Sequence, residues 1–200
     1  TAGNLIVLVT IFMIRIPQAP RAAGRKSVTR DMIEGLQLAW STPTFFALFT
    51  LLGIVTFCTK PYTQFMPVFA RDIFHGGPNT LGFLMGMSGL GALIGAVYLA
   101  ARKSVIGLAR IIAWTAGLFG LTLMAFAFSR HYWLSMLILL VSGFGMMVHM
   151  ASCNTILQTI VEEDKRGRIM SFYTMAFLGM MPFGSLLAGG LAAKIGAPVT

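Results

Sequence analysis

The chain has 200 residues, of which 56% are hydrophobic and only 10% are charged, with a net charge of +9. An ordinary soluble domain has roughly a quarter of its residues charged, so this composition excludes the soluble globular class. Nucleic acid is not an expected partner, because Lys and Arg occur in short clusters between apolar stretches and not along one basic face. The chain is therefore predicted to be an integral membrane protein.

The first 44 residues are predicted to precede the main membrane bundle. Residues 1–16 are a short apolar run followed by charge, which we interpret as the end of a transmembrane helix that begins outside this sequence. Residues 17–44 are predicted to be a linker, since Pro17 and Pro20 break helices. Within it, residues 27–40 have apolar side chains at every fourth position, typical of an amphipathic helix on the membrane surface.

Residues 45–200 are predicted to form an all-α, polytopic membrane bundle. Each apolar stretch is long enough to cross a hydrocarbon core about 30 Å thick. The predicted spans are Phe45 to Phe69, Thr80 to Ala101, Leu108 to Phe128, Tyr132 to Ile156 and Ile169 to Lys194. All connections between them are short, which favours antiparallel neighbours in one compact bundle.

Charge predicts which loops are cytoplasmic, because cytoplasmic loops collect Lys and Arg. When successive loops are assigned to alternate sides, Arg71, Arg130 and Lys194 fall on one side. The other side receives Arg15, Arg21, Arg25, Lys26, Arg30, Arg102, Lys103, Arg110, Lys165, Arg166 and Arg168. The linker 17–44 and the loops 102–107 and 157–168 are therefore predicted to be cytoplasmic.

The first span is the most polar of the five. Its polar side chains gather at helical spacing on one side, at Thr56, Thr59, Lys60, Thr63 and Gln64. Such a face is expected to line a cavity and not to face lipid. For Lys60 a second interpretation stays open, in which the side chain extends to the membrane surface.

The fourth span carries polar residues that include His149 and Asn154. A histidine at membrane depth can carry a proton or bind a ligand, or it can be a hydrogen-bonded structural residue. No span contains Asp or Glu, so a carboxylate proton relay is not expected within this chain. Cys58 and Cys153 lie in apolar stretches, where neither a disulfide, a metal site nor a cofactor is expected.

Two further segments have both an ordinary and a functional interpretation. Gly82, Gly86, Gly91 and Gly95 in the second span form two GxxxG pairs, which favour close helix packing or a face that shifts against a neighbouring helix. The charged segment that ends in Arg166, Gly167 and Arg168 is either a solvated loop or, at a helix N-terminus, a cytoplasmic gate that receives an acidic residue.

Several segments together resemble the major facilitator superfamily, and within it the bacterial efflux branch that includes the enterobactin exporter. These segments are Pro61-Tyr62, Met66 to Asp72, Leu81 to Leu84, Gly89 to Ala96, Asn154 to Gln158 and Arg166 to Ser171. The resemblance implies a twelve-helix protein in which residues 1–16 close helix 6 and the five spans are helices 7 to 11. The N-terminal half and helix 12 would then lie outside this sequence.

The resemblance also implies a function. We expect a secondary transporter of the bacterial inner membrane that exports a small amphipathic molecule, a drug or a siderophore, by alternating access with proton coupling. Helices 7, 8, 10 and 11 would line its cavity, and helix 9 would face lipid. Residues 101–104 lack the Asp of the superfamily's gating motif, so a reciprocal acidic latch is not expected at that loop.

Two alternatives remain from the sequence. The first is an importer of the same fold, and the second is a scaffold or sensor that moves no substrate. An enzyme is not expected, because its only candidate pair is His149 and Cys153, four residues apart, with no third residue to orient them.

Overall fold

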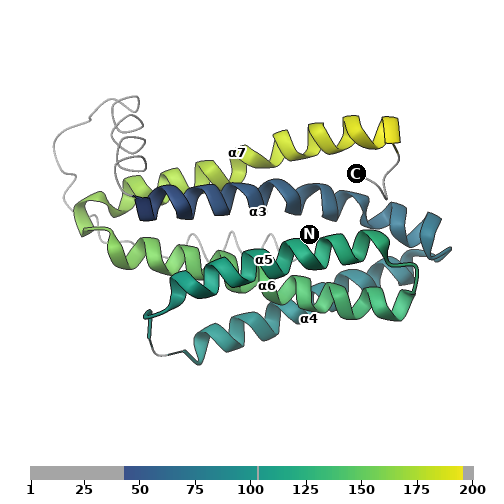
Figure 1. The fold of residues 1–200 in the computed structure, drawn as a ribbon, viewed down its shortest axis with the longest axis horizontal. Coiled ribbons are helices and arrows are strands. Elements are labelled where there is room, and N and C mark those ends of the chain that lie inside the picture. Colours follow the sequence, from purple (N-terminus) through teal and green to yellow (C-terminus); the bar gives the residue numbers. More distant parts are fainter. Residues whose placement is uncertain (1–42, 103, 196–200) are drawn as a thin grey trace, which may run out of the picture.

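The computed structural model describes residues 43–102 and 104–195, except for the side chains of residues 60, 164, 165, 168 and 195. This part of the chain is built from helices (Figure 1). They are α3 (Pro43–Val68), the π-helical turn η1 (Phe69–Ile73), α4 (Pro78–Ala100), α5 (Leu108–Phe128), α6 (Tyr132–Ile160) and α7 (Glu163–Ile195). The predicted helix end over 1–16 and the linker up to residue 42 lie outside the described residues.

In the described part of the chain, five helical segments are long and apolar enough to cross a membrane, as predicted for residues 45–200. They are Pro43–Ile73, Pro78–Ala100, Leu108–Phe128, Tyr132–Ile160 and Ile169–Lys194. The third agrees with the prediction at both ends. The first runs four residues further because a π-helical turn continues α3, with the amide of Phe74 donating to the carbonyl of Phe69 at 3.0 Å.

The predicted loop over residues 157–168 is wrong in its secondary structure. Helix α6 continues to Ile160 and α7 begins at Glu163, so only two residues connect them. The acidic residues before Lys165 favour the start of a helix, because carboxylates near a helix N-terminus interact well with its dipole. One turn later, Arg166 lies 3.9 Å from Glu163, a spacing that supports helix and not loop.

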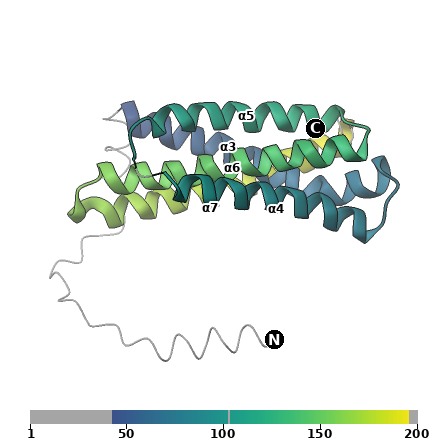
Figure 2. The same ribbon diagram turned by 90° about the horizontal axis from the view of Figure 1, so that it is seen from below.

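The helices form two groups, a layer of three and a pair. Helix α6 lies between α4 and α5 and packs against both, while α3 packs along α7 (Figure 1). After a quarter turn about the horizontal axis, α5 lies at one edge and α4 at the other, with α6 between them (Figure 2). Helix α6 is thus the centre of the bundle.

Glycines bring the backbones of α4 and α6 together reciprocally. A Cβ atom on Gly91 of α4 would overlap the carbonyl oxygen of Leu140, and one on Gly143 of α6 would overlap the carbonyl oxygen of Ser88. One turn further, a Cβ on Gly95 would lie 3.0 Å from the carbonyl oxygen of Phe144. Small residues let helices approach closely in lipid, where packing drives association.

The pairing of α3 with α7 also depends on a glycine. Pro61 lacks an amide hydrogen, so the carbonyl of Phe57 has no partner at the usual helical position four residues later. A Cβ on Gly184 of α7 would overlap that same carbonyl oxygen. The two helices therefore meet where α3 is interrupted and α7 has no side chain.

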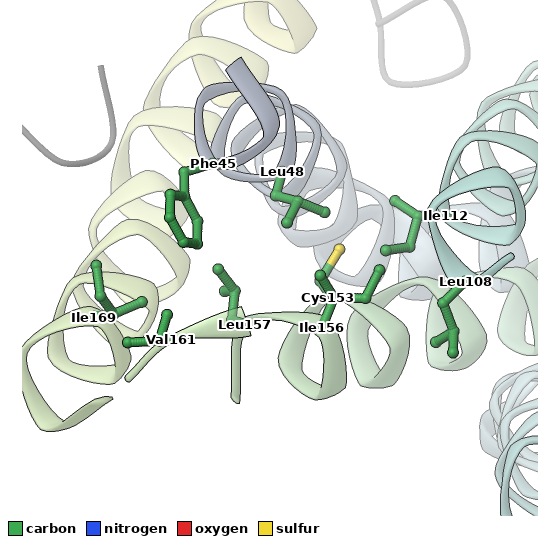
Figure 3. Close-up of a cluster of buried hydrophobic side chains, with 9 residues drawn as sticks. All are labelled: Phe45, Leu48, Leu108, Ile112, Cys153, Ile156, Leu157, Val161 and Ile169. Carbon is green, nitrogen blue, oxygen red and sulfur yellow. The ribbon is translucent and has the colours of Figure 1, made fainter. Parts of the chain in front are cut away.

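A cluster of buried apolar side chains joins the two groups at one end of the bundle (Figure 3). Its residues come from α3 (Phe45, Leu48), α5 (Leu108, Ile112), α6 (Cys153, Ile156, Leu157), the connection (Val161) and α7 (Ile169). A second cluster at the other end contains Met66, Leu84 and Leu139. Polar side chains are also buried along the bundle, among them Thr56 of α3, Thr115 of α5, and Ser142 and His149 of α6.

Candidate functional site

His149 lies on the side of α6 that faces α5. Its side chain is fully buried, and its Nδ1 is 3.2 Å from the carbonyl oxygen of Ile112. Since a carbonyl only accepts, Nδ1 carries the proton and donates it. Cys153 Sγ lies 3.8 Å from the other ring nitrogen. This geometry fits the structural interpretation of His149, and it leaves the His149–Cys153 pair without access for a substrate.

The polar stripe predicted on α3 is divided by depth of burial. Thr56 and Thr59 are buried in the bundle, and the Thr59 hydroxyl donates to the carbonyl of Val55 at 2.7 Å. Thr63 is half-buried and Gln64 is exposed. The side chain of Lys60 lies outside the described residues. The stripe therefore runs from the interior of the bundle to its surface.

Four buried hydroxyls find no hydrogen-bond partner among the described residues, at Thr56 and Tyr62 of α3 and at Ser142 and Ser152 of α6. Ser142 and Ser152 are 1% and 0% exposed, so neither reaches bulk solvent. They share the buried side of α6 with His149. The interior of the bundle therefore contains hydroxyl groups that are not paired by hydrogen bonds among the described residues.

A polar cluster forms where α6 meets α7. Asn154 is half-buried and accepts a hydrogen bond from the side-chain amide of Gln158, one turn later. The hydroxyl of Tyr173 on α7 donates to the carbonyl of Met150 at 3.3 Å. Asn154 and His149 are five positions apart, about 140° around a helix, so the two predicted site residues of α6 point in different directions.

Tyr173 was missed by sequence reasoning. It stands among Phe, Met and Leu in α7, and its only signal was a hydroxyl in an apolar span. A buried tyrosine hydroxyl usually requires a partner from another element. From that rule, Tyr173 could have been predicted to form a contact between helices.

A shallow groove of about 560 Å³ runs along the open face of α7. It is lined by Gly167, Met170, Ser171, Thr174, Met175, Leu178 and Gly179. The hydroxyls of Ser171 and Thr174 donate to carbonyls one turn earlier, at 2.9 Å to Gly167 and 2.9 Å to Met170. The groove therefore offers flexible thioethers and small hydroxyls, a surface suited to a ligand of mixed polarity.

The predicted gate residues lie inside α7 and not before it. Arg166 is 3.9 Å from Glu163, and Gly167 lies at one end of the groove along α7. The side chain of Arg168 lies outside the described residues. The gate role of these three residues stays a prediction, now placed on the first turns of a helix.

The predicted glycines of α4 fall on two faces. Gly91 and Gly95 touch α6, whereas a Cβ on Gly82 or Gly86 would meet no atom within 4 Å in the described part of the chain. The packing role of Gly82 and Gly86 therefore stays a prediction.

No group of three His, Cys, Asp or Glu side chains that could hold a metal ion occurs among the described residues.

The comparisons with known proteins decide the family. The family described as "Transmembrane secretion effector", of the major facilitator superfamily, matches residues 1–200. The chain belongs to this family. Membership in the transmembrane secretion effectors confirms the resemblance inferred from the motifs and accounts for the five spanning helices of the described residues.

Two curated transport proteins are similar to this transmembrane secretion effector. The Staphyloferrin A transporter of Staphylococcus aureus is 25% identical over 173 residues, which cover 86% of this chain and 42% of that protein. The Multidrug efflux pump Tap of Mycolicibacterium fortuitum is 23% identical over 205 residues, which cover 100% of this chain and 50% of that protein. The chain thus spans half or less of each relative. No solved structure matches it.

Proposed function

We propose that this chain is part of a secondary active transporter that exports a small amphipathic molecule across the bacterial inner membrane. The family match along all 200 residues carries this proposal. The two relatives, by name a Staphyloferrin A transporter and a multidrug efflux pump, support the substrate class, and the second also supports the direction. The end of the bundle that carries Arg102, Arg110 and Arg166 is cytoplasmic in this proposal.

In the proposed mechanism, substrate contacts the side of α6 that faces α7. Asn154 and Gln158 supply amide groups there, and Tyr173 supplies a hydroxyl. Met170 and Met175 add adaptable apolar surface along the neighbouring groove. The other half of the wall comes from the N-terminal half of the protein, and rocking of the two halves exposes the site to each side in turn.

Proton coupling requires a titratable group within the membrane-spanning part of the protein. The sole Asp or Glu of the five described spans is Asp72, which is exposed in the π-helical turn at the end of the first, so the proton carrier is His149, Lys60 or a residue of the N-terminal half. The hydrogen bond and full burial of His149 favour the last two.

The test is transport by the complete gene product in liposomes. Proton flux would be recorded as amphipathic drugs and siderophores are added, with the wild type beside Asn154→Ala, Lys60→Ala and Thr159→Ala. Thr159 is the matched control, because it is an exposed polar residue on the same helix whose hydroxyl donates to the carbonyl of Thr155.

We expect substrate-dependent flux in the wild type and in Thr159→Ala, and a higher half-saturating substrate concentration in Asn154→Ala. Absence of proton flux with every compound would rule out the hypothesis of proton-coupled export. Equal proton flux in all variants would show that the substrate-binding site does not include Asn154 of α6. Flux that runs only inward in oriented vesicles would establish the importer.

A further inference from the structure

One face of α5 carries a groove that the transport proposal does not use. Its volume is about 360 Å³, and it is lined by Arg110, Ala113, Trp114, Gly117, Leu118 and Leu121. These positions recur at intervals of three and four, so they form one stripe along the helix. The recess exists because Ala113 and Gly117 are small, and a Cβ on Gly117 would meet nothing within 4 Å.

The length of the groove corresponds to one leaflet of a bilayer. From Arg110 to Leu121 the helix rises eleven residues, or about 16 Å. Half of a hydrocarbon core is about 15 Å. Trp114 and Leu121 are 75% and 66% exposed, so their side chains stand beside the recess and face the surrounding lipid. The recess therefore fits an extended acyl chain.

The charge lies at the end of the groove where a headgroup would lie. Arg110 is exposed in the first turn of α5 and forms no ion pair with any described residue. Arg102 of the preceding loop is engaged differently, since its guanidinium donates to the carbonyls of Ser104 and Ile106. Arg110 is thus a cation available to a phosphate, and Trp114 follows one turn deeper, at the depth typical of interfacial aromatic residues.

We propose that the Arg110–Leu121 face of α5 is a binding site for one anionic phospholipid. Its phosphate binds the guanidinium of Arg110, and one acyl chain lies over Ala113 and Gly117 as far as Leu121. Charge complementarity selects an anionic over a zwitterionic lipid, because a zwitterionic headgroup carries its own cation. This site is independent of substrate and of transport direction.

The test is native mass spectrometry of the complete gene product, purified in a mild detergent and titrated with phosphatidylglycerol or phosphatidylethanolamine of identical acyl chains. We expect one phosphatidylglycerol to bind about tenfold more tightly than phosphatidylethanolamine, the size of one charge-assisted contact. Arg110→Ala should abolish the preference. Gly117→Leu, whose side chain would fill the recess, should weaken phosphatidylglycerol binding about fivefold or more.

Arg130→Ala and Trp133→Ala are the controls. Both residues are exposed at the opposite end of the bundle, with Trp133 76% exposed, and both variants should bind phosphatidylglycerol as the wild type does. An equal loss in Arg110→Ala and Arg130→Ala would overturn the site in favour of unspecific charge attraction. No preference in the wild type, or unchanged binding by a folded Gly117→Leu variant, would also overturn it.

Discussion

Helix α6 has two unlike sides. Toward α4 it contacts a neighbouring backbone directly at Gly143 and Leu140, and toward α5 it buries His149 completely. Toward α7 it presents Asn154, accepts a hydrogen bond from the Tyr173 hydroxyl at the carbonyl of Met150, and buries Ile156 and Leu157 in the cluster that contains Ile169. One helix therefore has a side built for rigid packing and a side left partly open and polar. In the proposed function, the packed scaffold and the substrate-binding surface share α6, and substitutions should separate them.

The largest effect is expected on the packed side. Gly143→Ala places a methyl group against the carbonyl of Ser88, and α4 and α6 must move apart to accept it. We expect a loss of about 3 kcal/mol of stability, the upper part of the range for overpacking. Thermal unfolding of the purified protein measures this loss. Gly86→Ala is the matched control, since its methyl group meets no described atom. Equal unfolding midpoints for both variants would contradict the contact.

A smaller loss is expected between α3 and α7. Gly184→Ala places one methyl group against the Phe57 carbonyl, but this contact is single, whereas α4 and α6 meet at two reciprocal ones. We expect a loss of about 2 kcal/mol in the same unfolding measurement. Gly189→Ala on the same helix should leave the midpoint unchanged, because a Cβ there meets nothing within 4 Å. A larger loss than that of Gly143→Ala would reverse the ranking of the two interfaces.

His149→Leu distinguishes the two interpretations of this histidine. Leucine fills a similar volume and removes the hydrogen bond to Ile112 together with the weak contact with the Cys153 thiol. Hydrogen bonds inside membrane proteins contribute about 0.6 kcal/mol on average. We expect a stability loss of about that size, with substrate-driven proton flux retained. A folded variant that transports substrate without moving protons would make His149 the proton carrier instead.

The smallest effect on stability is expected on the open side. Asn154→Ala removes one exposed hydrogen bond with Gln158, so the unfolding midpoint should change by less than about 0.5 kcal/mol in equivalent stability. Transport should suffer, with a rise of about fivefold in the half-saturating substrate concentration, the equivalent of one lost hydrogen bond. Tyr173→Phe removes only a hydroxyl and should act in the same direction. A fall in stability without a transport defect would place Asn154 in the scaffold.

The number and type of the helices were predictable because an apolar run of about 20 residues has few other stable structures in a membrane. The orientation of individual side chains was not. Gly86 and Gly91 both stand in GxxxG pairs of one helix, and only the position of α6 decides which pair is packed. Hydropathy also placed a loop at residues 157–168, because it measures affinity for lipid and not for helix.

The site could be predicted only in part for the same reason. Asn154 and His149 carried equal weight in the sequence, yet five positions of a helix turn them toward different neighbours. Tyr173 became a candidate only when α7 was placed beside α6. The family resemblance was recoverable because its motifs are glycine and proline patterns, which depend on backbone geometry more than on side-chain orientation.

The reciprocal glycines also limit how α4 can be displaced along α6. If α4 slides by one residue, Leu90 or Ala92 meets the Leu140 carbonyl in place of Gly91, and the contact is lost. Relative to that carbonyl, the next glycine on the same face is Gly95, four residues or about 6 Å away. The interface can therefore hold discrete registers only, with nothing stable between them, and thermal motion of α4 should be confined to tilting about its glycines.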